Sequence, residues 1–269
     1  MPAAFRTYIT SGRLPVEAAP GLHWLGGCSD SGTWPGREGI RHTHEHCSSF
    51  LVVGSAKTVL IDTGHFALWY AVEGQLEQAL GGRQVDYILP SHQEIPHAGN
   101  LGRLMAKYPN SVAIGDVRDY HLFHPEIDRE RLVVMRDGES VDLGDSEFVV
   151  LDAVWKDLTG SMWGYDTRLK ALFPADGLGY VHDHEPAVCG LLAADLPEDY
   201  QPYEQWRFAL PFIGMKFQST LPGVRRYREL LEKHPVEIIC SAHGAPMTTD
   251  IAEFTEIMLG VIAENRSSM

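Results

Sequence analysis

The sequence predicts an α/β fold in which two β-sheets pack face to face and helices lie outside them. Short apolar stretches with strand character alternate with helical stretches over most of the 269 residues. Pairs of strands occur in both halves of the chain, as in a sandwich of two sheets. Because no internal repeat, low-complexity tract or linker divides the sequence, we expect a single domain over residues 1–269.

The first half begins with a predicted hairpin and a helix. Two strands, Ser49–Gly54 and Thr58–Asp62, flank a short turn. Phe66–Leu80 then carries apolar residues at helical spacing and ends at two glycines, which is a common helix stop. The next stretch alternates strand, helix, strand and helix, with the ranges Val85–Leu89, Gly99–Tyr108, Ser111–Gly115 and Val117–Phe123.

The second half is predicted to begin with a β-meander over residues 131–153, and its strands are Arg131–Met135, Ser140–Leu143 and Glu147–Ala153. Residues 198–234 are predicted to be mostly helical, and the last helix is amphipathic. Further strands and this last helix are expected at Leu169–Pro174, Ala187–Ala193, Val236–Ser241 and Ile251–Glu264.

Charge and composition exclude several classes of partner. With 22 Lys and Arg against 36 Asp and Glu, the formal net charge is -14. This charge opposes binding to nucleic acid or to an anionic membrane, because such binding depends on cationic side chains that neutralise phosphates. No apolar run is long enough to span a bilayer and no secretion signal is evident, so a cytoplasmic protein is expected. The four cysteines match neither a disulfide framework nor a zinc ribbon.

The segment from Ser91 to Asn100 contains the strongest chemical signal. It follows a predicted buried strand and precedes a helix, which is where α/β folds place their sites. Pro96 is tolerated only in the first helical turn, so His92 and Glu94 are expected on the loop and His97 near the helix start. Two imidazoles and a carboxylate that converge there suit zinc or iron.

Three other predicted strands end in residues of the same kind. Asp62 and Asp176 each follow a strand and precede a glycine turn, and His243 follows the last strand. One such residue is usually a cap or a turn residue, because Asp and Asn favour these positions. Their recurrence at four strand ends favours a shared metal site.

On these residues the chain resembles the metallo-β-lactamase superfamily, and most closely the diiron domain of flavodiiron proteins. The resemblance extends from about Ser48 to Ala245. Glu94 stands where the superfamily usually has histidine, which marks the flavodiiron branch. The resemblance implies an αββα sandwich of two mixed sheets, with the metal site at one edge. Its markers are Ile61-Asp62-Thr63-Gly64, His92-x-Glu94-x-x-His97-x-Gly99-Asn100, Ser161-Met162, Asp176-Gly177-x-Gly179 and Ser241-Ala242-His243-Gly244.

The resemblance also implies a ligand set. Carried over by position, His92 and Glu94 bind a first metal, and His97 and His243 bind a second. Asp176 bridges the two metals. Asp62 orients the site without being a ligand.

Two positions depart from the family pattern. Pro96 stands where the family has Asp, so that position has no coordinating side chain. The histidine that the family carries shortly before Ser161-Met162 is also missing, and Asp157 is the best candidate to replace it. A dinuclear and a mononuclear centre both remain open, and the dinuclear centre is favoured.

The leading hypothesis is a non-haem diiron oxidoreductase that binds or reduces O2 or NO, or uses O2 to oxidise a small substrate. A carboxylate-rich ligand set favours iron or manganese over zinc, and a carboxylate-rich pair of sites is typical of diiron chemistry. The sequence shows neither the flavodoxin-like domain of the flavodiiron proteins nor a phosphate-binding glycine loop, so we expect no bound flavin and an external electron donor. Two alternatives remain: a zinc or manganese hydrolase of a thioester, lactone or phosphoester, and an O2 or redox sensor without turnover. The oligomeric state stays open, a homodimer included.

Five further histidines have both a metal-binding and a structural interpretation. His42, His44 and His46 precede the first strong strand and are more typical of a solvated loop than of a metal site. His182 and His184 follow Asp176 closely and are candidates to line the pocket. We expect none of the five to be a ligand.

Overall fold

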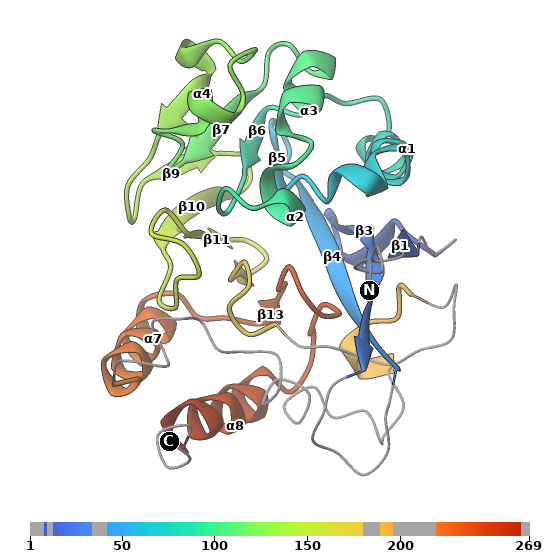
Figure 1. Ribbon diagram of the computed structural model, residues 1–269. Helices are drawn as coiled ribbons and strands as arrows, with labels where there is room; N and C mark the ends of the chain where they lie inside the picture. Colours follow the sequence, from blue (N-terminus) through green and yellow to red (C-terminus); the bar gives the residue numbers. More distant parts are fainter. Residues whose placement is uncertain (1–7, 10–12, 34–41, 180–188, 196–218, 265–269) are drawn as a thin grey trace, which may run out of the picture.

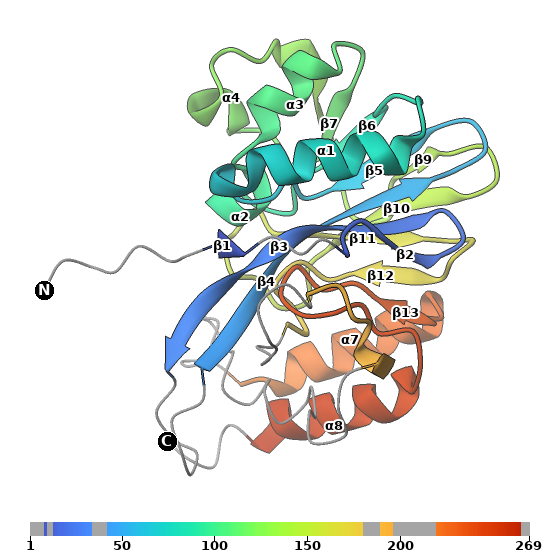
Figure 2. The same cartoon turned by 90° about the vertical axis from the view of Figure 1, so that its right-hand side faces the viewer.

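The computed structural model describes residues 8–9, 13–33, 42–179, 189–195 and 219–264, and within them two sheets lie face to face between two layers of helices (Figures 1 and 2). The predicted αββα sandwich is therefore confirmed. The helices outside the first sheet are α1 (Trp69–Leu80), α3 (Leu101–Lys107) and α4 (Tyr120–Phe123), and those outside the second are α7 (Leu221–Lys233) and α8 (Ile251–Glu264). Short helical turns are α2 (Ile95–Ala98), η1 (Phe66–Leu68), η2 (Arg129–Arg131) and η3 (Ala193–Asp195).

The first sheet is mixed. Its order in the described residues is β1-β3-β4-β5-β6-β7-β8, with β2 paired to β3. The pairs up to β5 are antiparallel and those from β5 to β8 are parallel. Its strands are β1 (Tyr8–Ile9), β2 (Val16–Ala19), β3 (Leu22–Thr33), β4 (His42–Val53), β5 (Thr58–Ile61), β6 (Tyr87–Leu89), β7 (Val112–Gly115) and β8 (Leu132–Val134).

The second sheet is also mixed, in the order β13-β12-β11-β10-β9. Only the pairing of β12 with β13 is parallel. Its strands are β9 (Ser140–Asp142), β10 (Glu147–Asp152), β11 (Met162–Asp166), β12 (Ala171–Phe173) and β13 (Ile238–Ile239).

The sheets are joined by aromatic packing in the main core. The Phe173 ring of β12 lies between Phe50 of β4 and Phe148 of β10, at centroid distances of 5.7 and 5.9 Å. All three rings are buried. A second apolar cluster, which includes Leu60, lies between the first sheet and α1, α3 and α4. Since β5 is buried on both faces, it is a continuous apolar run rather than an alternating one.

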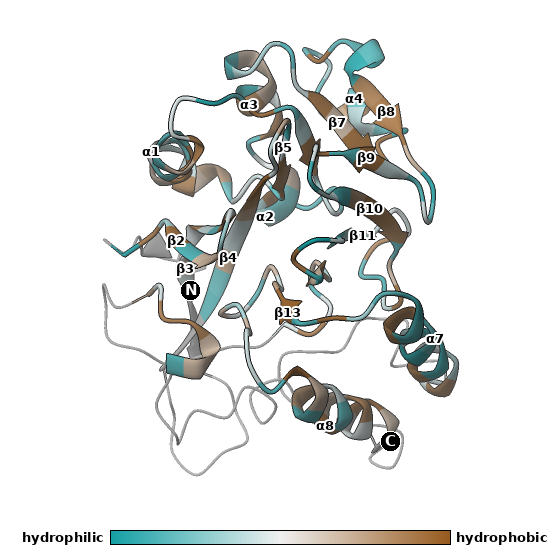
Figure 3. Ribbon diagram, turned by 180° about the vertical axis from the view of Figure 1, so that it is seen from behind, coloured by the Kyte–Doolittle hydropathy of each residue, from teal (hydrophilic) through white to brown (hydrophobic). Residues whose placement is uncertain are grey.

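Hydropathy follows this layering (Figure 3). Strands β5, β7 and β10 are mainly apolar, whereas α1 and α7 carry both polar and apolar residues. This pattern is typical of sheets that are covered on both sides and of amphipathic helices with one solvent-exposed face. No helix in the described part of the chain is both long and apolar enough to cross a membrane.

The hairpin and the first long helix are confirmed. Phe50 pairs with Ile61 across β4 and β5. The helix begins as η1, continues as α1 and ends at Gly81, whose φ of 56° is the left-handed conformation expected at a helix end. The last predicted helix matches α8, Ile251–Glu264.

Three expectations about strands are wrong. The β-meander does not form, because β8 pairs with β7 in the first sheet while β9 and β10 belong to the second. The described part of Ala187–Ala193 contains no strand, and η3 begins at Ala193. The segment with His42, His44 and His46 is part of β4 rather than a loop, and the His46 side chain is buried.

Candidate metal centre

The candidate ligands all follow the ends of strands at one edge of the sandwich. His92 follows β6, and Asp62 follows the neighbouring parallel strand β5. From the second sheet, Asp157 follows β10, Asp176 follows β12 and His243 follows β13. The parallel pairing of β5 with β6 and of β12 with β13 places these strand ends side by side, as parallel strands do in other α/β sites.

The helix start after β6 separates the ligands of the central motif. Glu94 has extended backbone geometry at the N-cap of α2, and Pro96 lies in the first turn. His97 follows within the helix and is fully buried. The loop therefore carries His92 and Glu94, and the helix brings His97 back toward them, as the position of Pro96 predicts.

The two oxygens of Asp176 face different histidines. Oδ1 lies 3.0 Å from Nε2 of His97 and 3.0 Å from Nε2 of His243. Oδ2 lies 3.3 Å from Nε2 of His92. One carboxylate thus faces histidines from the loop after β6, from α2 and from the loop after β13.

Asp157 lies near His92 and Glu94. Ligand atoms of His92, Glu94 and Asp157 lie within 4.8 Å of one another, and so do those of His92, His97 and Asp176. The structure therefore brings together all six residues named as ligands from the sequence. Asp157, the candidate named in place of the missing family histidine, lies in the loop before Ser161-Met162.

Several donor atoms face one another without hydrogen bonds. In the described residues, Nε2 of His92, Nε2 of His97 and Oδ1 of Asp176 are buried and none has an aligned hydrogen-bond partner. Nε2 of His97 nevertheless lies 3.0 Å from Oδ1 of Asp176, and Nε2 of His92 lies 3.3 Å from its Oδ2. A buried polar atom without a partner costs about 1–3 kcal/mol. Nitrogen and oxygen lone pairs that point at a common place fit a metal ion that would satisfy them.

The histidines near Asp176 supply positive charge in this arrangement. Burial opposes their charged forms, but Asp176 and Asp62 raise the pKa of His97 well above its usual value. Glu45 and Asp176 likewise outweigh burial and raise the pKa of His243 to about 9. A divalent ion at the same atoms provides this charge and displaces the two protons, so its binding releases protons.

The side chains of His92, Glu94 and Asp157 carry an excess of negative charge instead. Burial, Asp157 and Asp176 raise the pKa of Glu94. Burial and Asp176 raise the pKa of Asp157. Burial and the charge of His97 lower the pKa of His92 to about 4, so this imidazole is neutral and available as a ligand. Clustered carboxylates beside a neutral imidazole favour a cation of hard or borderline character.

Asp62 occupies the position expected of an orienting acid. Its Oδ2 lies 2.8 Å from Nδ1 of His97, and its Oδ1 accepts a hydrogen bond of 2.8 Å from the Ser91 N–H. Asp62 is buried and has a φ of 56°, a conformation that non-glycine residues rarely adopt. Because Asp62 holds Nδ1 of His97, the other ring nitrogen of His97, Nε2, faces Asp176.

We expect Asp62→Asn to weaken metal binding at His97 by about 10–100-fold, because the imidazole loses its charged acceptor. Asp86→Asn is the matched control, since Asp86 also holds backbone of β5, through the Thr58 N–H, but at the opposite end of the strand. Competition with a metallochromic chelator measures both affinities. Equal affinity in the two variants would contradict the orienting role of Asp62.

Sequence reasoning missed further contacts that hold the histidines. Ser91 Oγ lies 3.2 Å from Nδ1 of both His92 and His97. Nδ1 of His243 lies 2.6 Å from the carbonyl oxygen of His46 and 3.5 Å from Glu45. Every residue has a backbone carbonyl, so the sequence gives no signal for the contact of His46 with His243. The polar residues of β4 indicate only that part of this strand does not face the apolar core.

Two glycines of the Asp176 turn are explained by close packing. A Cβ at Gly177 would lie 2.7 Å from the Trp163 ring. A Cβ at Gly179 would lie 3.0 Å from the carbonyl oxygens of Asp176 and His243. The Asp176-Gly177-x-Gly179 pattern thus allows this turn to lie directly against the His243 loop.

Of the five further histidines considered above, the structure describes the side chain of His46 alone. The side chains of His42 and His44 lie outside the described residues, as do His182 and His184. The imidazole of His46 contacts the Cys189 thiol, with Nδ1 and Sγ 3.2 Å apart. His46 therefore contributes to the site through its carbonyl oxygen.

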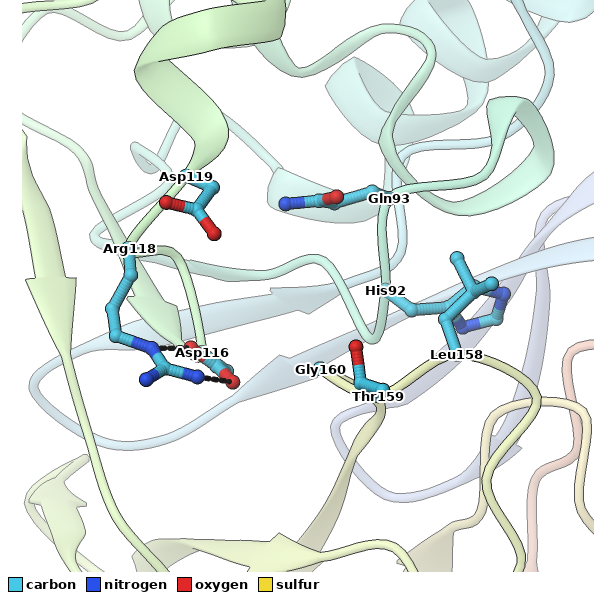
Figure 4. Close-up of a pocket in the computed structure, with 8 residues that line it drawn as sticks. All are labelled: His92, Gln93, Asp116, Arg118, Asp119, Leu158, Thr159 and Gly160. Atoms are coloured by element: carbon cyan, nitrogen blue, oxygen red, sulfur yellow. Dashed lines mark hydrogen bonds and ion pairs between the residues drawn. The ribbon is translucent and has the colours of Figure 1, made fainter.

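A cavity of about 180 Å³ lies beside His92 (Figure 4). Its wall consists of Gln93, the turn 116–119 and the loop 158–160. Arg118 forms a two-point ion pair with Asp116 on this wall. The cavity is polar and adjoins one candidate ligand directly, which suits the entry of small molecules.

Comparisons with known proteins identify the family of the chain. The sequence profile of the metallo-beta-lactamase superfamily matches residues 42–186. The anaerobic nitric oxide reductase flavorubredoxin of Pectobacterium atrosepticum is 25% identical over 259 residues, which are 91% of this chain and 48% of that protein. The chain thus spans about half the length of this relative.

Solved structures show the same fold. Rubredoxin oxygen:oxidoreductase from Desulfovibrio gigas superposes with a TM-score of 0.69 at 18% identity, over 94% of this chain and 61% of that one. A putative diflavin flavoprotein fragment from Nostoc sp. PCC 7120 gives 0.69 at 16% identity, over 97% and 98%. The expected resemblance to the diiron domain of flavodiiron proteins is confirmed. With a profile match over more than half of its residues, the chain belongs to the metallo-beta-lactamase superfamily.

Proposed function

We propose that the chain holds two iron ions and acts as a non-haem diiron oxidoreductase on O2 or NO, with electrons from an external donor. The observation that carries this proposal is the placement of Asp176, whose Oδ1 faces His97 and His243 while its Oδ2 faces His92. The names of the relatives, a nitric oxide reductase and an oxygen:oxidoreductase, support the two substrates.

The residues divide between the two ions as follows. His92, Glu94 and Asp157 hold the first ion, and His97 and His243 hold the second. Asp176 would be shared between the two ions, because its Oδ2 faces His92 and its Oδ1 faces His97 and His243. The second set has two histidines and one carboxylate, which leaves coordination positions open and is typical of ferrous sites that react with O2.

The donor chemistry favours iron over zinc. The first set contains oxygen donors and one imidazole and no thiolate, and Pro96 adds no ligand to the second. When bound, the iron pair supplies electrons and a binding place for a diatomic molecule. The protein orients the imidazoles through Asp62, Ser91 and the His46 carbonyl, and it excludes water by burying His92 and His97.

The test is to supply iron, zinc and manganese together, measure metal per chain, and then follow consumption of O2 and NO with a chemical reductant. Asp157→Asn is expected to lower occupancy of the first position, whereas the exposed Asp119→Asn is the control on the cavity wall. Iron with O2 or NO consumption supports the proposal. Zinc or manganese with hydrolysis of a thioester or lactone would replace it by a hydrolase. A stable oxygenated complex without turnover would indicate a sensor.

A further inference from the structure

Three aromatic side chains form a contact cluster next to the metal centre. Trp155 lies in the loop after β10, Trp163 in β11 and Tyr227 in α7. The ring centroids of the two tryptophans are 5.9 Å apart, and Tyr227 lies 5.0 Å from Trp155 and 6.1 Å from Trp163. These distances are those of directly packed rings.

The cluster contacts the segments that carry the ligands. The edge of the Trp163 ring packs on Gly177, directly after Asp176. Trp155 precedes Asp157 by two residues in the same loop. Trp163 is completely buried, whereas Trp155 keeps 6% of its surface exposed. The two indoles therefore lead from the bridging carboxylate toward the surface beside α7.

Packing alone does not explain two tryptophans here. Among the described residues, neither indole N–H has a hydrogen-bond acceptor, and a buried donor without a partner costs about 1–3 kcal/mol. By contrast, the buried Trp24 donates its indole N–H to Ser48 Oγ at 2.9 Å. Phenylalanine would fill similar apolar space without this cost, so the indole has a use other than filling the core.

The indole ring is among the side chains that are most easily oxidised by one electron. An oxidised indole releases its N–H proton readily when an acceptor is hydrogen-bonded to it, and this release traps the oxidised state. Because Trp155 and Trp163 lack such an acceptor within the part of the chain that the structure describes, each retains its proton and passes the oxidised state on. This environment favours electron transfer between the two indoles over trapping of the oxidised state on one of them.

We propose that Trp163 and Trp155 form a one-electron relay between the metal centre and the protein surface. The relay rests on the proposed diiron function. Reduction of O2 to water takes four electrons, and a ferrous pair supplies two. When the donor is exhausted, the other two electrons follow one at a time: Trp163 gives an electron to the oxidised centre, Trp155 reduces Trp163, and a small one-electron reductant in solution, such as ascorbate, reduces Trp155. The protons for water come from the solvent. No bond breaks and no proton leaves either indole.

The experiment uses the full chain loaded with iron, reduced without excess reductant and mixed with O2. Samples are frozen at intervals for electron paramagnetic resonance, and iron content and O2 consumption are measured on the same preparation. An indole radical is expected, with hyperfine structure that changes when the protein contains ring-deuterated tryptophan. Trp163→Phe is expected to abolish the signal, and Trp155→Phe to make it insensitive to ascorbate. Trp24→Phe is the matched control and retains the wild-type signal.

The possible outcomes separate the relay from the proposed function. O2 consumption without an indole radical, or a radical that survives in Trp163→Phe, would overturn the relay and leave the diiron function intact. Absence of bound iron, or of consumption of both O2 and NO, would overturn both, whereas consumption of NO without consumption of O2 would overturn the relay alone. Ring deuteration is applied to the wild-type chain, so the assignment to tryptophan stands even if a variant folds poorly.

Discussion

Replacing Asp176 by alanine is expected to remove metal from both positions at once. Its oxygens lie 3.0–3.3 Å from the Nε2 atoms of His92, His97 and His243, so the substitution takes one donor from each group. Loss of a partner outside the ligand set already weakens metal binding by about 10–100-fold, and loss of a shared ligand is expected to exceed this for both ions. Metal analysis after gel filtration measures the result.

The loss of metal expected for Asp176→Ala also has an electrostatic cause. Burial opposes the charge of Asp176, but His97 and His243 outweigh it and hold the pKa of this carboxyl well below its usual value. Without the carboxylate, each imidazole loses one of the two acids that favour its protonated form, and Asp62 remains beside His97 and Glu45 beside His243. Asp119→Ala, an exposed substitution on the cavity wall, is expected to keep both metals. Retention of one full metal in Asp176→Ala would show that the two groups bind independently.

Phe173→Ala is expected to destabilise the fold by about 3–5 kcal/mol, because it removes a fully buried ring and leaves a cavity. The ring lies between Phe50 and Phe148 and joins the two sheets. Because β12 leads directly to Asp176, we also expect weaker metal binding. Unfolding in urea, followed by circular dichroism without added metal, measures the stability.

Val134→Ala on β8 is the control for this substitution. Val134 is 47% exposed and lies at the edge of the first sheet. Surface substitutions of this kind usually change the free energy of unfolding by less than about 0.5 kcal/mol. A loss below about 1 kcal/mol for Phe173→Ala would contradict the packing of the two sheets through this ring.

The central features of the site were predictable from the sequence because they depend on local patterns. Pro96 fixes the helix start, which places His92 and Glu94 on the loop and His97 inside the turn. Asp157 follows from counting back from Met162, and the structure places it beside Glu94. Each of these inferences needs only a few neighbouring residues and the resemblance of the motifs.

The contacts that depend on distant segments were not predictable. Residues 131–153 have the same strand and turn pattern whether β8 joins β9 or β7, so the change of sheet has no local signal. The strand β3, Leu22–Thr33, lacks both clear alternation and a continuous apolar run, and sequence analysis missed it. The His46 carbonyl binds His243 from a strand 197 residues away, and any residue type has such a carbonyl.

Iron content combined with electron paramagnetic resonance tests most directly whether Asp176 joins two ions into one centre. Protein loaded with iron in the presence of zinc and manganese is expected to contain about two irons per chain, as in other two-metal sites. The oxidised pair is expected to show no resonance because the two ferric spins couple through the bridge, and partial reduction is expected to reveal a mixed-valent signal. One iron per chain, or two with the resonance of isolated ferric ions, would contradict a centre bridged by Asp176.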